Sequence, residues 1–275
     1  MITKLTFTIS FFLFFLNSYS QIDTAIIFSE IRELKTDDMI DEYWRELDSC
    51  DQDLNTFTNP VTQTENLVKT IYFFKYFGFN RNNRFKINTI SQSNAEMHAL
   101  YIWMHNRFVD LNSYTFPLIS ECRKIYLYDG GEINYYLQNV QIDRFEKVEF
   151  NNKLSLYFKE KSFEKININN VVSLANEAMK IYSIKDSKKN VNGRWRLVKE
   201  NLNQYEVQII LIENNYYLHE LKGNYYKLKQ DDFNNKYFHF SNEIDDTYLE
   251  ILENGDLVNK DLKGKTLTVY KKISF

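Results

Sequence analysis

The stretch that decides the fold is residues 205–230, YEVQIILIENNYYLHELKGNYYKLKQ. It contains three short runs rich in β-branched and aromatic residues, separated by the turn-forming pairs Asn214-Asn215 and Gly223-Asn224. Short runs of this composition at roughly ten-residue spacing, joined by tight turns, are typical of consecutive antiparallel strands. The stretch therefore predicts a meander of short strands.

The same pattern extends in both directions and reaches the end of the chain. Further turn signals fall at Asn234-Asn235, Asn254-Gly255 and Lys263-Gly264. The expected strands are residues 194–200, 205–212, 216–221, 225–230, 237–241, 247–252, 257–261 and 266–273. Eight consecutive antiparallel strands can close into a barrel, which removes exposed edges. We expect a small eight-stranded antiparallel meander barrel over residues 186–275.

Upstream of the barrel the dominant hydrophobic period is helical. The expected helices are residues 37–54, a helix that begins at Thr62 or Thr64 and ends at Gly78, a helix from Ser93 to about Asn106, and residues 112–123, 132–145 and 170–184. Ser93 and Glu96 form a capping box, and Pro117 predicts a kink or a late start in its helix. The fold class is therefore α+β, with an all-helical domain over residues 21–185 followed by the barrel.

Residues 1–20 have the three parts of a cleavable signal peptide. Lys4 follows the initiating Met1, residues 5–16 are mostly apolar, and Ser18 and Ser20 place small residues before Gln21. A membrane anchor is the alternative, but twelve apolar residues fall short of the ~20 that span a bilayer. We expect an extracytoplasmic protein, periplasmic or secreted, with a mature N-terminus at Gln21 and no integral membrane span.

Cys50 and Cys122 are the only two cysteines. An oxidising compartment would allow them to form a disulfide. The alternative is two inert buried thiols, because nothing in the sequence shows that the two Cα atoms come within bonding distance.

Composition excludes several classes of protein. The chain has 275 residues, with 34 Lys+Arg against 37 Asp+Glu, a formal net charge of -3 that argues against a nucleic-acid partner. No phosphate-binding glycine loop or dinucleotide motif occurs, so no cofactor is expected. His98 and His105 would lie about 10.5 Å apart along one helix, too far to share a metal ion, and no metal site is expected.

Gly193-Arg194-Trp195, at the start of the first expected strand, resembles the Gly-x-Trp opening of lipocalin-like barrels. The resemblance implies structural roles for Gly193 and Trp195, with the Trp closing one end of the barrel. It also implies that a basic residue of the last strand, Lys271 or Lys272, packs on the Trp. An eight-stranded barrel with short strands has an interior that side chains nearly fill, so both a packed structural barrel and a small apolar ligand remain open.

Four short motifs of the helical half occur in order: Asp51-Gln52, Tyr76-Phe77-Gly78, Met104-His105 and Asp143-Arg144. Over residues 38–165 they resemble a bacterial helical domain family of unknown function. The resemblance implies positions of interest and no particular activity.

Hydrophobic periodicity indicates the same positions independently. Asp51 completes the apolar stripe of its helix, and Arg144 extends that of another. A lone buried charge is costly, so we expect Asp51 and Arg144 to meet in the helical core, with His105 close by. The alternative is that both helices end early and the charges reach solvent.

These features favour a binding protein whose partner is a small ligand, a glycan or an envelope protein. The alternative is an extracytoplasmic hydrolase-like enzyme whose catalytic candidates are Asp51, His105, Asp143 and Arg144. A purely structural envelope protein is the third possibility. An enzyme requires the polar cluster to line an open cleft, whereas a binding or structural role allows it to be sealed.

Overall fold

The structure is a computed structural model that describes residues 21–52, 59–79, 84–87, 91–126, 162–184, 189–197, 205–220, 223–234, 236–241 and 247–273. The expected signal peptide over residues 1–20 and the expected helix over residues 132–145 lie outside these ranges.

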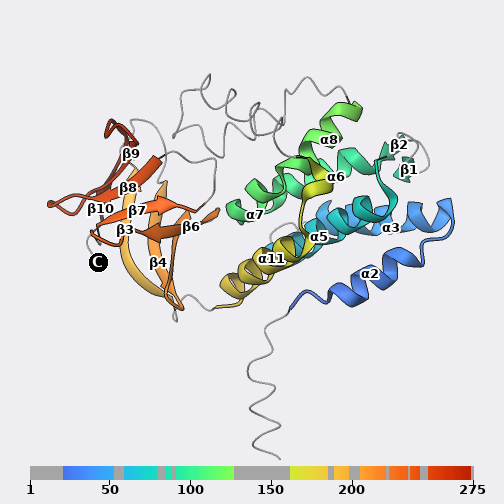
Figure 1. The fold of residues 1–275 in the computed structure, drawn as a ribbon, viewed down its shortest axis with the longest axis horizontal. Helices are drawn as coiled ribbons and strands as arrows, with labels where there is room; N and C mark the ends of the chain where they lie inside the picture. Colours follow the sequence, from blue (N-terminus) through green and yellow to red (C-terminus); the bar gives the residue numbers. More distant parts are fainter. Residues whose placement is uncertain are drawn as a thin grey trace, which may run out of the picture.

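The N-terminal half is a bundle of helices, as the hydrophobic period predicts (Figure 1). The described helices are α2 (Thr24–Arg32), α3 (Asp37–Gln52), α5 (Pro60–Phe77), α6 (Ala95–His105), α7 (Val109–Tyr114), α8 (Phe116–Tyr126), the short 3₁₀ helix η1 (Phe163–Lys165) and α11 (Ile168–Ser183). Asp23 begins α2, where its side chain accepts hydrogen bonds from the backbone N–H groups of Ala25 and Ile26. Gly78 ends α5 with a φ of 74°, a left-handed value that suits glycine.

Several details of the helical half differ from expectation. The helix α5 begins after Asn59 instead of Thr62 or Thr64, because the Asn59 side chain caps it and Pro60 occupies a first-turn position that needs no N–H donor. The helix expected over residues 112–123 is two helices separated at Thr115, with Pro117 in the first turn of the second. An unexpected antiparallel hairpin, β1 (Arg84–Ile87) with β2 (Ser91–Asn94), precedes α6. The predicted capping box is therefore wrong, because Ser93 pairs with Phe85 in this hairpin and α6 begins at Ala95.

The C-terminal half is a closed eight-stranded antiparallel barrel, as predicted. Its strands are β3 (Asn190–Leu197), β4 (Glu206–Ile212), β5 (Asn215–Glu220), β6 (Tyr225–Gln230), β7 (Tyr237–Phe240), β8 (Thr247–Ile251), β9 (Leu257–Asp261) and β10 (Thr266–Lys272). Neighbours in sequence pair with each other, and β10 returns to pair with β3. The fold class is therefore α+β, a helical bundle followed by a meander barrel.

Trp195 and its neighbours fill one end of the barrel. The Trp195 side chain is buried, and its indole N–H donates to the carbonyl of Gly255 in the β8–β9 turn at 2.9 Å. Lys272 stands opposite Trp195 in the backbone register, whereas Lys271 forms an ion pair with Asp256. Inward residues of the other strands complete a packed interior that includes Val207, Leu218, Tyr226, Phe238 and Leu249.

The helical half and the outer face of the barrel share an apolar core, separate from the barrel interior. Ile210, Ile212, Tyr217 and Tyr225 face outward from β4, β5 and β6 and pack with the helices. In Figure 1, α7 and α11 are the helices nearest to the barrel. From α7, Val109 packs with the residues of the barrel interior. Backbone pairing between Phe108 and Tyr225 adds to the junction, so the barrel is covered along one flank by the bundle.

The cysteines do not form the disulfide that the compartment would allow. Both lie among the described residues, and neither is disulfide-bonded. Cys50 is exposed on α3, whereas Cys122 is completely buried on α8. The prediction of two buried thiols is therefore wrong for Cys50, which lies off the buried face of α3 that carries Trp44 and Asp51.

Candidate functional site

The pair formed by Asp51 and His105 joins the last turn of α3 to the last residue of α6. The Nδ1 atom of His105 lies 2.9 Å from both carboxylate oxygens of Asp51. Because a carboxylate accepts hydrogen bonds, His105 donates from Nδ1, and its Nε2 atom is directed away from Asp51.

A second pair of the same kind lies on the same two helices. Nδ1 of His98 is 2.6 Å from Oδ1 of Asp48. Asp48 and Asp51 are three residues apart on α3, so both aspartates lie on one face of that helix. His98 and His105 are seven residues apart and lie on one face of α6. Two histidine–aspartate contacts therefore fasten α3 to α6.

The remaining catalytic candidates cannot be placed against this pair. Asp143 and Arg144 lie outside the described residues, and with them the expected Asp51–Arg144 contact. The Asp51 side chain is 1% exposed and that of His105 is 17% exposed. The Asp51–His105 pair is thus almost sealed, which is the arrangement that a structural or binding role allows.

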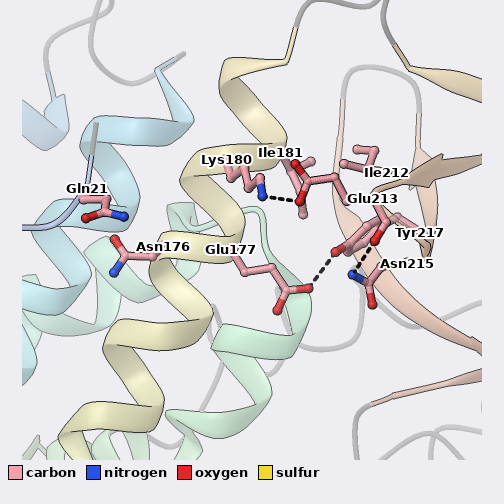
Figure 2. Close-up of a pocket in the computed structure, with 9 residues that line it drawn as sticks. All are labelled: Gln21, Asn176, Glu177, Lys180, Ile181, Ile212, Glu213, Asn215 and Tyr217. Carbon is pink, nitrogen blue, oxygen red and sulfur yellow. Dashed lines mark hydrogen bonds and ion pairs between the residues drawn. The ribbon is translucent and has the colours of Figure 1, made fainter. Parts of the chain in front are cut away.

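A cavity of about 300 Å³ lies where α11 meets the β4–β5 hairpin, and we call it the junction cavity (Figure 2). Nine residues line it: three with side-chain amides (Gln21, Asn176, Asn215), three with charges (Glu177, Lys180, Glu213), and Ile181, Ile212 and Tyr217. Figure 2 shows Glu177 and Lys180 extending from α11 toward the hairpin.

Local structure explains why these residues meet. Asn176 and Lys180 are four residues apart on α11 and therefore share one face of it. The hairpin turns through Glu213 and Asn214, whose φ values of 46° and 68° match a two-residue primed turn. Ile22 is buried, and its backbone N–H donates to Oδ1 of Asn176 at 2.9 Å, which fixes Gln21 at the wall.

The charges of the junction cavity are already paired within the protein. Glu177 accepts a hydrogen bond of 2.6 Å from the Tyr217 hydroxyl and lies 2.7 Å from the Lys227 ammonium. Lys180 forms an ion pair with Glu213. Burial, reinforced by the neighbouring Glu177, raises the pKa of Tyr217 far above its ordinary value, so Tyr217 remains a neutral donor.

No local pattern in the sequence predicts the junction cavity. Its residues come from three segments, near residues 21, 176–181 and 212–217, and each is an ordinary polar or apolar residue in its own segment. On α11 the polar residues Asn176, Glu177 and Lys180 stand beside the buried Ala175, Ala178 and Ile181, which is the pattern of any helix with one solvent-exposed face.

Within the described ranges, no group of three or more His, Cys, Asp or Glu side chains is arranged to hold a metal ion. Nor does any helix of the described part have the length and apolar character needed to cross a membrane.

The chain matches no protein-family model, no curated protein and no solved structure. The resemblances to lipocalin-like barrels and to the bacterial helical family therefore remain expectations.

Proposed function

We propose that the chain is an exported binding protein that takes a small polar ligand into the junction cavity. The observation that supports this best is the cavity itself, a hollow of about 300 Å³ lined by three side-chain amides where the two halves meet. Ligand sites commonly lie at such junctions and have volumes from roughly 300 Å³ upward.

The polar lining favours a ligand with hydrogen-bonding groups. A side-chain amide can both donate and accept, so Gln21, Asn176 and Asn215 together offer both kinds of partner. Ile181 and Ile212 supply an apolar part of the wall. A few polar groups that fix orientation beside apolar surface are typical of small-molecule sites.

Binding can be tested by the thermal stability of the mature chain with single small molecules: glucose, succinate, choline and glycine. A ligand that binds only the folded state stabilises it by RT ln(1 + L/Kd), where L is the free ligand concentration, so the unfolding temperature rises with the logarithm of ligand concentration above Kd. We expect one of these probes to do so, and Asn215→Ala to reduce the shift. Asn170→Ala is the matched control, since Asn170 is exposed on α11 outside the cavity. An equal shift in both variants, or none with any probe, would contradict the proposal.

Export is the second part of the proposal and rests on residues 1–20. Lys4, the apolar run over residues 5–16 and the small residues Ser18 and Ser20 support cleavage before Gln21. N-terminal sequencing of protein from the native host tests it. A mature chain that begins at Gln21 supports export, whereas one that keeps Met1 to Ser20 contradicts it.

A second candidate function is acid–base chemistry at His105. The observation that favours it is the contact from Nδ1 to both oxygens of Asp51, which holds the ring in one orientation, as the carboxylate of a catalytic His pair does. Solvent access decides between the candidates. Diethyl pyrocarbonate should modify His105 at a rate near that of the 44% exposed His239 if the site is open. A rate as slow as that of His98, which is 6% exposed, would leave the pair a structural one.

A further inference from the structure

The side chains of the junction cavity offer a ligand no uncompensated charge. Glu177 is held by Tyr217 and Lys227, and Glu213 is held by Lys180. A charged ligand would have to compete with one of these internal partners for the opposite charge. The free energy that the charged ligand loses when it leaves water would be only partly recovered, because each carboxylate of the cavity already has a cation beside it.

The amides, in contrast, have hydrogen-bonding capacity to spare. Within the described residues, the side chain of Gln21 makes no hydrogen bond, and Asn176 uses only its oxygen, for the N–H of Ile22. Asn215 makes one long contact of 3.5 Å from its nitrogen to the carbonyl of Glu213. Two amide nitrogens, of Gln21 and Asn176, and two amide oxygens, of Gln21 and Asn215, thus remain for a ligand.

Hydroxyl groups are the best match for such a set. An alcohol donates one hydrogen bond and accepts others, so neighbouring hydroxyls can satisfy amide nitrogens and oxygens alike. Ile181 and Ile212 provide apolar wall for the C–H groups between hydroxyls. A volume of about 300 Å³ lies at the small end of ligand sites and suits a single ring.

We propose that the junction cavity binds one ring of a neutral sugar, free or at the end of a glycan. This inference rests on the proposed binding function and narrows it to a ligand class. Gln21, Asn176 and Asn215 contact the hydroxyls, while the two ion pairs keep the wall electrically balanced. A ligand that leaves polar groups of the site unpaired binds weakly. A charged group on the sugar would find no free opposite charge among the side chains of the wall, so it should weaken binding.

The test is isothermal titration of a chain that retains Ser20, so that residue 21 carries no N-terminal ammonium. The neutral sugars are glucose, galactose and N-acetylglucosamine, and their charged counterparts are glucuronate, galacturonate and glucosamine. We expect at least one neutral sugar to bind tenfold or more tightly than its charged counterpart. Asn215→Ala and Gln21→Ala should each weaken that binding severalfold, whereas Asn170→Ala should not change it. Circular dichroism of each variant shows whether it is folded, and two independent cavity variants keep the test decisive if one is not.

Changing the charge balance gives a second readout. Glu213→Gln leaves the Lys180 ammonium without its carboxylate, so this variant should gain affinity for glucuronate relative to glucose. If a charged counterpart binds the unaltered protein as tightly as the neutral sugar, the ligand class is wrong while the binding function stands. If these sugars and the small-molecule probes all fail to bind, the binding function falls as well.

Discussion

The indole of Trp195 lies over Gly193, two residues earlier on the same strand. A Cβ atom on residue 193 would stand 2.6 Å from Cζ2 and 2.9 Å from Cζ3 of the ring. These distances are far shorter than carbon–carbon contacts, so glycine is the only residue that leaves room for the ring. The Gly-x-Trp spacing is therefore a packing relationship in this barrel, since alternate residues of a strand share one face.

The Gly193→Ala substitution should lower the free energy of unfolding by about 1–3 kcal/mol, because overpacking forces the buried indole to move. Urea denaturation of the full chain measures it. Gly223→Ala is the matched control, since its Cβ would meet Glu220 at a milder 3.3 Å. Equal stabilities for the two variants would show that Trp195 can shift at no cost.

Replacing the indole itself should cost more. Trp195→Ala removes a buried large aromatic and should destabilise the full chain by ~3–5 kcal/mol. Trp195→Phe keeps a ring but loses the hydrogen bond to the Gly255 carbonyl, so its loss should be smaller, about 1–2 kcal/mol. Near-wild-type stability of Trp195→Ala would contradict its role in closing the barrel.

Asp51 and His105 should be energetically coupled. The buried group of the contact is the Asp51 carboxylate, so His105→Ala, which removes the imidazole beside it, should cost roughly 3 kcal/mol. A double-mutant cycle with Asp51→Ala should give a coupling of about 1–3 kcal/mol in unfolding free energy. The exposed pair Glu42–Arg45 is the control, with a coupling below about 0.5 kcal/mol. Additive effects at Asp51 and His105 would mean that their proximity has no energetic consequence.

Acid should weaken the barrel partly through Glu206. Hydrogen bonds from Arg196, and next those from Arg194, lower the pKa of Glu206 below its ordinary value. A carboxyl whose pKa is lower in the folded state stabilises it at pH above the unfolded-state pKa, and this contribution disappears as the pH falls through the folded-state pKa. Unfolding free energies of the wild type and Glu206→Gln should therefore converge in acid. A difference that stays constant from neutral to acidic pH would refute the linkage.

The thiols should differ sharply in reactivity. Iodoacetamide should alkylate the exposed Cys50 in the folded protein without prior reduction. Cys122 should react only after unfolding, because complete burial, with Glu96 nearby, raises the pKa of its thiol and excludes the reagent. Mass spectrometry counts the adducts. Two cysteines that remain unmodified in denaturant until a reductant is added would reveal a disulfide.

The barrel could be predicted from the sequence because its determinants are local. Turn-forming pairs separate most consecutive strands, and the observed bounds of β6 and β9 coincide with the predicted ones. The hairpin β1–β2 was missed because the second strand, Ser91–Asn94, is entirely polar and overlaps the residues of an apparent helix cap. Its pairing with Arg84–Ile87 gives it a strand conformation that its own residues do not favour.

Sites were harder to predict than elements. Helical periodicity placed Asp51 on the inward face of α3, and the side chain is buried there. Periodicity cannot name a partner, because any inward polar residue of another helix would serve. The junction cavity depends on three distant segments that meet only in the folded chain, so no local pattern of Gln21, Asn176 or Asn215 could reveal it.

The outward residues Ile210, Ile212, Tyr217 and Tyr225 have a consequence for reuse of the barrel by itself. A barrel with this flank, fused to an unrelated protein, would carry a strip of uncovered apolar surface and tend to aggregate. The barrel therefore depends on the bundle for its solubility, and substitutions on α7 and α11 are constrained by the strands that these helices cover.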